Sequence, residues 1–95
     1  LKKLEIRENS IESIEEEGFY GLNNLNELDL SYNILQIIKK RSFFGLDNLK
    51  KLHLSSNSIE SIEEEGFYGL NNLIELVLSF NKFQIIKKRS FFGLV

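Results

Sequence analysis

An asparagine recurs every 24 residues along this 95-residue chain, at Asn9, Asn33, Asn57 and Asn81. An apolar frame recurs with it. The first copy of the frame consists of Leu1, Leu4, Ile6, Asn9, Ile11, Ile14, Phe19 and Leu22, and each later copy places equivalent residues 24 positions further on. A fixed period of this length is typical of repeat proteins, whose units bury their apolar faces against one another. We therefore expect a single array of four repeats, residues 1–24, 25–48, 49–72 and 73–95.

The spacing within one repeat predicts a short strand at its beginning. Apolar residues at the fourth and sixth positions point to one side of a strand, and the residues between them point to the other. Stacking the repeats then forms rows of leucine and isoleucine across the core. The phenylalanines of the frame are expected to form a stacked column on the far side, and they are Phe19, Phe43, Phe67 and Phe91.

The asparagine and glycine positions predict two further features of each coil. A buried asparagine is costly unless its amide is hydrogen-bonded, so we expect a ladder that bridges backbone groups of neighbouring coils. A glycine follows each phenylalanine of the frame by two positions, where it suits a tight turn with positive φ. These glycines are Gly21, Gly45, Gly69 and Gly93.

The pattern of the first copy, LKKLEIRENSIESIEEEGFYGL, resembles the leucine-rich repeat family. It is closest to the 24-residue form common in extracellular proteins such as Toll-like receptors and variable lymphocyte receptors. The resemblance implies an α/β fold: a curved solenoid with parallel strands on the concave face and loops or short helical turns on the convex face. It also implies use as a protein-binding scaffold.

Two departures from the extracellular pattern qualify this resemblance. Proline often follows the second isoleucine-type position in such proteins, whereas this chain has Glu15, Lys39, Glu63 and Lys87 there. The cysteine-rich caps that close such arrays are also missing, so we interpret the sequence as an excerpt of a longer array. An extracellular or cell-surface location is expected, and the cytoplasm is the alternative.

A longer period underlies the shorter one, because residues 1–47 and 49–95 differ at only ten of 47 aligned positions. Odd repeats carry an acidic triplet, 15–17 or 63–65, and even repeats a basic one, 39–41 or 87–89, at the same place. Neighbouring coils stack at about 4.8 Å, so we expect a ladder of opposite charges between repeats. A heparin or nuclear-import patch and a cation site are the alternative interpretations of the triplets.

The residues that point outward from the strands form the candidate partner-binding face. They are Lys3, Glu5, Arg7 and Glu8, then Glu27, Asp29, Ser31 and Tyr32, then Lys51, His53, Ser55 and Ser56, then Glu75, Val77, Ser79 and Phe80. Half of the ten differences between the two halves fall on this face, whereas the convex side is copied almost unchanged. This distribution favours a face tuned for a partner over free drift of surface positions. Tyr32 and Phe80 are candidate anchors, with a role as staples over the core edge as the alternative.

Neither catalysis nor a cofactor is predicted. The only histidine is His53, the chain has no cysteine, and no nucleophile-elbow, phosphate-loop or zinc-ligand spacing occurs. No metal site is expected. A formal net charge of −2 argues against nucleic acid as the partner, and no stretch is apolar for long enough to suggest membrane contact.

The sequence leaves two functions in competition. The first is a non-catalytic recognition module that binds a protein ligand on the concave face. The second is a structural or engineered array with no ligand of its own, because recent duplication and deliberate design both leave nearly identical halves. In that case copies of the chain could associate head to tail, with a basic fourth repeat against an acidic first repeat.

Overall fold

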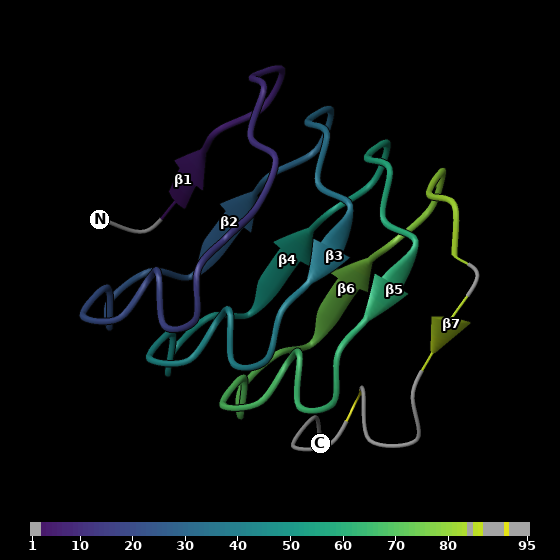
Figure 1. Ribbon diagram of the computed structural model, residues 1–95. Coiled ribbons are helices and arrows are strands. Elements are labelled where there is room, and N and C mark those ends of the chain that lie inside the picture. Colours follow the sequence, from purple (N-terminus) through teal and green to yellow (C-terminus); the bar gives the residue numbers. More distant parts are fainter. Residues whose placement is uncertain (1–2, 84, 87–90, 92–95) are drawn as a thin grey trace.

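The computed structural model describes residues 3–83, 85, 86 and 91 as a solenoid of stacked coils. Its strands are β1 (Lys3–Glu5), β2 (Glu27–Asp29), β3 (Ile37–Ile38), β4 (Lys51–His53), β5 (Ser61–Ile62), β6 (Glu75–Val77) and β7 (Ile85–Ile86). Each coil passes along one wall and returns along the other, so the two rows of arrows in Figure 1 point in opposite directions. The predicted leucine-rich repeat solenoid is confirmed.

The first wall is a parallel four-stranded sheet in the order β1-β2-β4-β6. Each strand pairs with the equivalent strand of the next repeat. Leu4 therefore lies beside Leu28, Leu28 beside Leu52, and Leu52 beside Leu76. We call the outward side of this sheet the concave face. Because the register preserves the 24-residue period, each outward position of one repeat lies beside the same position of the next.

The second wall is a parallel three-stranded sheet in the order β3-β5-β7. Its strands are two residues long and pair Ile38 with Ile62 and Ile62 with Ile86. Turns, rather than helical segments, connect this wall to the next coil throughout the part of the chain that the structure describes. The convex side was expected to contain loops or short helical turns, and the loop alternative is the one observed.

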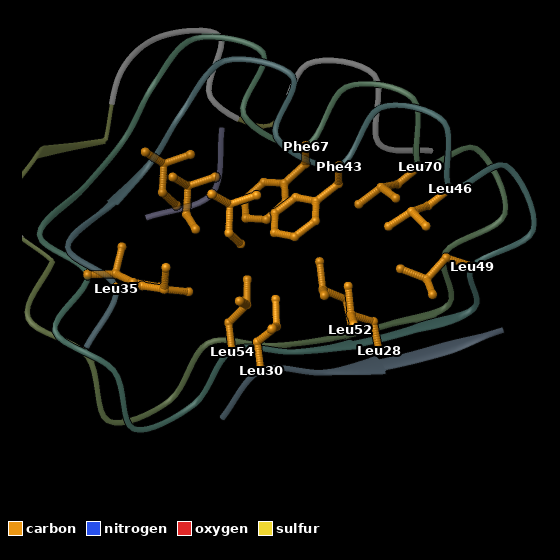
Figure 2. Packing of buried hydrophobic residues seen from close by; sticks show 14 of the residues in the cluster. Leu28, Leu30, Leu35, Phe43, Leu46, Leu49, Leu52, Leu54, Phe67 and Leu70 are labelled. Atoms are coloured by element: carbon orange, nitrogen blue, oxygen red, sulfur yellow. The ribbon is translucent and has the colours of Figure 1, made fainter. Parts of the chain in front are cut away.

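The core lies between the two walls and continues from repeat to repeat. Leu28, Leu30, Leu52 and Leu54 are almost completely buried beneath the concave face. Figure 2 shows the rings of Phe43 and Phe67 stacked on the other side of these leucines. The predicted phenylalanine column is confirmed: ring centroids are 6.0 Å apart for Phe19 and Phe43, 5.9 Å for Phe43 and Phe67, and 5.5 Å for Phe67 and Phe91.

The asparagine ladder is also confirmed. The Asn57 amide donates to Leu30 O and Leu54 O, each at 3.1 Å, while its Oδ1 accepts from Leu35 N at 3.1 Å. Asn33 and Asn81 make equivalent bonds to the repeat before each of them. Asn9 is exposed and donates to Arg7 O at 3.0 Å. Each buried asparagine therefore joins two consecutive coils through their backbones.

The glycine that follows each phenylalanine has the predicted positive φ, 101° at Gly21, 102° at Gly45 and 97° at Gly69, while Gly93 lies outside the described residues. The structure adds a second reason for glycine. A Cβ at Gly45 would lie 3.0 Å from the Tyr20 ring, and one at Gly69 would lie 3.1 Å from the Phe44 ring. The aromatic side chain of one repeat thus occupies the space that a larger residue in the next would need.

The charge ladder between repeats is present where the structure describes it. Lys39 Nζ lies 3.3 Å from Glu15 Oε2, and Arg41 Nε lies 3.3 Å from Glu65 Oε1. The second basic triplet, residues 87–89, lies outside the described residues. Arg41 does more than neutralise a carboxylate, because its guanidinium also lies 4.7 Å from the Tyr68 ring centroid and 5.8 Å from that of Phe44.

A second aromatic column, which the sequence analysis missed, supports this arginine. The rings of Tyr20 and Phe44 stack with centroids 6.0 Å apart, and those of Phe44 and Tyr68 are 6.1 Å apart. Its sequence signal is an aromatic residue directly after each phenylalanine of the frame, at the same 24-residue period.

Candidate binding face

The parallel register gathers the predicted partner-binding residues on one side of the four-stranded sheet. Among them, Lys3, Glu5, Arg7, Glu8, Tyr32, Glu75, Ser79 and Phe80 are exposed, Glu27, Asp29, Lys51, His53, Ser55, Ser56 and Val77 are half-buried, and Ser31 is buried. Two rows cross the strands. One contains Lys3, Glu27, Lys51 and Glu75, and the other contains Glu5, Asp29, His53 and Val77.

The charges of the first two repeats on this face largely pair with one another. Lys3 Nζ lies 3.8 Å from Glu27 Oε2 and 3.9 Å from Glu5 Oε2. Arg7 Nε lies 3.5 Å from Asp29 Oδ2, and the Arg7 guanidinium lies 5.3 Å from the centroid of the Tyr32 ring. Charged groups that already satisfy one another have less to gain from a partner, so the paired charges of this half are a poor source of binding energy.

The Asp29 carboxylate of the face contacts both Arg7 and Ser31. Partial burial by itself raises its pKa, but hydrogen bonds from Ser31 and the positive charges of Arg7 and His53 outweigh burial and hold the pKa below its ordinary value of 3.8. The backbone N–H of Ser31 donates to Asp29 Oδ1 at 3.0 Å. The carboxylate therefore remains charged and fixes the conformation at the end of β2.

The third and fourth repeats present smaller and less charged side chains. His53 Nε2 lies 2.5 Å from Glu75 Oε2 across the two strands, so the single histidine has a carboxylate partner that sequence analysis did not assign to it. Ser55 Oγ donates to Ser31 Oγ at 3.2 Å. Because serine side chains are short, the surface of the sheet is recessed in this part of the face.

The last of the four outward positions in each repeat has a left-handed backbone. The φ angle is 57° at Glu8, 59° at Tyr32, 56° at Ser56 and 58° at Phe80. Positive φ is unusual for residues other than glycine, and four unlike side chains share it here. The coil geometry must therefore impose this conformation where the strand turns away.

Two aromatic side chains of the face are strongly exposed: Phe80 is 82% exposed and Tyr32 is 52% exposed. Ile74 directly precedes β6, was not among the predicted residues, and is 76% exposed. The difference between Asn26 and Ile74 in the alignment of the two halves was the signal that could have identified it.

The described residues contain no cluster of three or more histidine, cysteine, aspartate or glutamate side chains arranged to bind a metal ion. A search of the same part of the chain for a helix able to cross a bilayer found none. The face therefore combines paired charges in its first two repeats with two exposed aromatic side chains, Tyr32 and Phe80.

Comparison with known proteins agrees with this architecture. The family model described as "Leucine rich repeat" matches residues 1–59 and 47–95. No curated protein matches the chain. Among solved structures, the crystal structure of the TLR13–ssRNA13 complex superposes with a TM-score of 0.92 at 32% sequence identity and covers 97% of this chain. This chain spans 13% of the length of that receptor chain. From its repeats, its fold and the family model that matches its whole length, the chain belongs to the leucine-rich repeat family.

Proposed function

We propose that this chain is a non-catalytic recognition module that binds a protein partner through its concave face. The observation that carries the proposal is the exposure of Tyr32 and Phe80, which end the outward positions of the second and fourth repeats. Large aromatic and aliphatic side chains dominate the energy of protein interfaces, and they give the fold nothing when they remain in solvent. The exposure of Tyr32 and Phe80 also favours a role as anchors in an interface over a role in covering the edge of the core.

The distribution of sequence differences supports the same face. Comparing the two halves, Glu5, Arg7 and Glu8 correspond to His53, Ser55 and Ser56, and Asp29 corresponds to Val77. The frame of buried residues and the convex charges remain almost constant. A scaffold is suited to recognition when the residues of one exposed face differ between repeats and the core residues stay the same.

Protein is a better partner for this face than nucleic acid. Single-stranded RNA is the ligand in the similar TLR13 complex, but this chain corresponds to 13% of that receptor. The carboxylates of the face are Glu5, Glu8, Glu27, Asp29 and Glu75, and its cations are Lys3, Arg7 and Lys51. An excess of carboxylates repels phosphate, whereas nucleic-acid binders gather cations.

The likeness to the Toll-like receptor supports an extracellular or cell-surface location for the parent protein. The cytoplasm is the alternative. Locating the endogenous protein by surface labelling of intact cells and by fractionation distinguishes the two.

The proposal is tested by capturing partners on the immobilised chain and on two variants. The first variant combines Tyr32→Ser with Phe80→Ser on the concave face. The second combines Ile34→Ser with Ile37→Ser, two residues that are 42% and 41% exposed and lie outside the predicted partner-binding set. Each replacement introduces the serine that the chain already carries at an equivalent position of another repeat, so both variants should fold.

A partner that the wild type and the second variant retain, and that the first variant loses, supports recognition by the concave face. Equal capture by all three proteins contradicts it. Circular dichroism of both variants excludes loss of the fold as the cause.

A second candidate function, self-association of the array, is favoured by the charge register. β1 and β6 are the outer strands of the described four-stranded sheet. A second copy stacked on β6 would place its Lys3 beside Glu75, as Lys3 lies beside Glu27 within one chain. Light scattering over a wide concentration range tests this arrangement. A constant monomer mass contradicts it. A mass that rises with concentration, and that is lower for the Lys3→Glu variant, supports it.

A further inference from the structure

The first and third repeats can be compared directly, because their sequences differ only at residues 5–8 in the first and 53–56 in the third. The second repeat covers one side of the third repeat. The corresponding side of the first repeat faces solvent, at the end of the stack where Figure 1 shows β1. We call this surface the acidic end, and it consists of Asn9, Ile11, Glu17, Phe19, Tyr20 and Leu22. The third repeat therefore shows how such a surface changes when another repeat covers it.

Residues of the acidic end are more exposed than their equivalents in the third repeat. Leu22 is 40% exposed, whereas Leu70 is 1% exposed. Tyr20 is 68% exposed, whereas Tyr68 is half-buried. The same difference separates Asn9 from Asn57, Ile11 from Ile59 and Phe19 from Phe67. Covering by a neighbouring repeat thus removes apolar surface from water, which is the main driving force for stacking the coils.

The Asn9 amide lacks the bonds that its equivalent makes to another coil. Asn57 Oδ1 accepts from Leu35 N at 3.1 Å, and the Asn57 amide nitrogen donates to Leu30 O at 3.1 Å, both in the second repeat. Asn9 donates to Arg7 O within its own repeat, and no residue in the described part of the chain donates to Asn9 Oδ1. The acidic end therefore presents an amide that fits the backbone of another coil.

The Glu17 carboxylate is in a similar position. Its equivalent, Glu65, pairs with Arg41 Nε at 3.3 Å and has a side chain that is 16% exposed. Glu17 is exposed, and no cation in the described ranges forms an ion pair with it. Arg41 also lies 4.7 Å from the ring centroid of Tyr68, the equivalent of Tyr20. An arginine that reached the acidic end in the same way would contact both Glu17 and Tyr20.

The contact between two repeats depends on which kind comes first. Where an acidic repeat precedes a basic one, Lys39 pairs with Glu15, whose side chain is 80% exposed. Where a basic repeat precedes an acidic one, the arginine contacts described above are joined by a bond from Lys40 N to Glu63 Oε1 at 2.8 Å. The second kind of contact is the more buried and the more extensively bonded, and the acidic end carries the acidic half of it.

The fourth repeat carries the matching half. Its strand β6 is an outer strand of the described four-stranded sheet. Leu78 and Phe83 stand where the second repeat has Leu30 and Leu35, whose backbones bind Asn57. Within the described residues, Phe83 N has no acceptor. The basic triplet of the fourth repeat lies outside those residues, but its sequence, KKR, is that of the second repeat. A second copy of this chain therefore supplies a repeat of the kind that the acidic end fits.

We infer that the acidic end is a docking surface for the fourth repeat of a second copy, and that this contact reproduces the one between the second and third repeats. In it, Asn9 accepts from Phe83 N and donates to Leu78 O of the other copy. The inference rests on the self-association proposed above and specifies the surfaces and groups involved. Because the contact joins different surfaces of two copies, successive copies extend head to tail in one direction.

Cysteine cross-linking tests the register of this contact. Glu27 pairs with Lys51 between the second and third repeats, so Glu75 of one copy should lie beside Lys3 of the next. Neighbouring strands are about 4.8 Å apart, within reach of a disulfide. Within one chain β1 and β6 are three strand spacings apart, about 14 Å, which is too far.

The chain has no cysteine of its own, so single-cysteine variants report only on the introduced positions. Lys3→Cys and Glu75→Cys proteins, distinguished by mass, are mixed and oxidised with glutathione disulfide. We expect mainly the mixed disulfide between them. Replacing Glu75→Cys by Ser79→Cys moves the thiol out of register and should abolish it. Cross-links that join mainly like variants, or that form equally with Ser79→Cys, overturn the inference.

Substitutions in the acidic end test the groups that make the contact. Asn9→Ala removes the amide and Glu17→Arg opposes the basic triplet, so each should weaken association by at least about tenfold in sedimentation equilibrium. Glu12→Arg makes the same charge change and is the control, because its equivalent Glu60 remains exposed although the second repeat covers the third. It should change association by less than about twofold. Circular dichroism checks that each variant is folded.

The outcomes separate this inference from the self-association on which it rests. A wild-type mass that stays monomeric at all concentrations overturns both. Association that Asn9→Ala and Glu17→Arg leave unchanged overturns the docking of the acidic end, while self-association by another surface stands. Loss of association in these two variants but not in Glu12→Arg, together with the mixed disulfide, supports the inference.

Discussion

Arg41 and Tyr68, which lie in consecutive repeats, are joined by a cation–π contact in which the guanidinium is 4.7 Å from the ring centroid. Glu65 completes the arrangement by pairing with Arg41 Nε at 3.3 Å. The alternating triplets therefore do more than neutralise charge, because one member of the basic triplet also anchors the second aromatic column.

Replacing this arginine should cost more than removing a neighbouring lysine. We expect Arg41→Gln to lower the free energy of unfolding by about 1 kcal/mol, a value kept small because the ion pair is partly exposed to solvent. Lys39→Gln, whose partner Glu15 has an 80% exposed side chain, is the control and should cost less than about 0.5 kcal/mol. Urea unfolding measures both. An equal effect of the two substitutions would show that the ring contact contributes nothing.

The asparagine ladder should be among the most sensitive features of the fold. Asn57→Ala leaves the buried Leu35 N–H without its acceptor, whereas Leu30 O and Leu54 O keep the bonds that Asn33 and Asn81 donate to them. We therefore expect a loss of about 2 kcal/mol in the free energy of unfolding. Asn9→Ala removes one exposed bond and should cost less than about 1 kcal/mol. Chemical denaturation of the two variants provides the comparison, and similar midpoints would contradict the ladder as a stabilising element.

Two glycines with the same backbone conformation separate steric crowding from backbone strain. Gly21 and Gly45 have φ of 101° and 102°, but a Cβ meets no atom within 4 Å at Gly21 and lies 3.0 Å from the Tyr20 ring at Gly45. Alanine at either position should cost about 1–2 kcal/mol for its positive φ. Gly45→Ala should cost more, and the double variant Gly45→Ala with Tyr20→Ser should recover only part of the excess, because Tyr20 Cα also lies 3.0 Å from such a Cβ. Thermal unfolding measures the difference, and equal costs at Gly21 and Gly45 would contradict the crowding.

Asp29 should make the stability of the fold depend on pH. Its pKa is held below the ordinary value in the folded chain, so the unfolded chain binds the proton more readily and stability rises with pH through this range. The contribution is complete above the ordinary value and is lost as pH falls through the lowered one. Asp29→Asn should therefore flatten the acid side of the stability profile, as pH falls below the ordinary value of 3.8. Glu8→Gln, an exposed carboxylate on the same face, controls for the change in net charge, and an equal flattening in both variants would contradict the role of Asp29.

The sequence predicted the features that depend on the buried frame alone. The register of Leu4 on Leu28, the stacked phenylalanines and the amide bonds of Asn57 all follow from the 24-residue period. Each is confirmed because a buried apolar or amide group has few ways to be satisfied, and the repeat supplies the same way each time.

Other features of the structure were not predicted. The two-residue strands around Ile38 and Ile62 are too short to carry an alternating pattern. The pair of His53 and Glu75 depends on how far two side chains reach across strands, which spacing along the chain does not reveal. Tyr32 and Phe80 are exposed, as their outward positions predicted, whereas Ser31 is buried despite its predicted outward position.

The left-handed residues that end each concave strand have an evolutionary consequence. Glutamate, tyrosine, serine and phenylalanine occupy this place with nearly the same φ, at Glu8, Tyr32, Ser56 and Phe80. The neighbouring coils impose this conformation, so the strain energy of the backbone is nearly the same whichever of these side chains is present. A mutation there can change what the molecule touches while leaving its folding nearly unaltered, and new specificities can therefore arise one codon at a time.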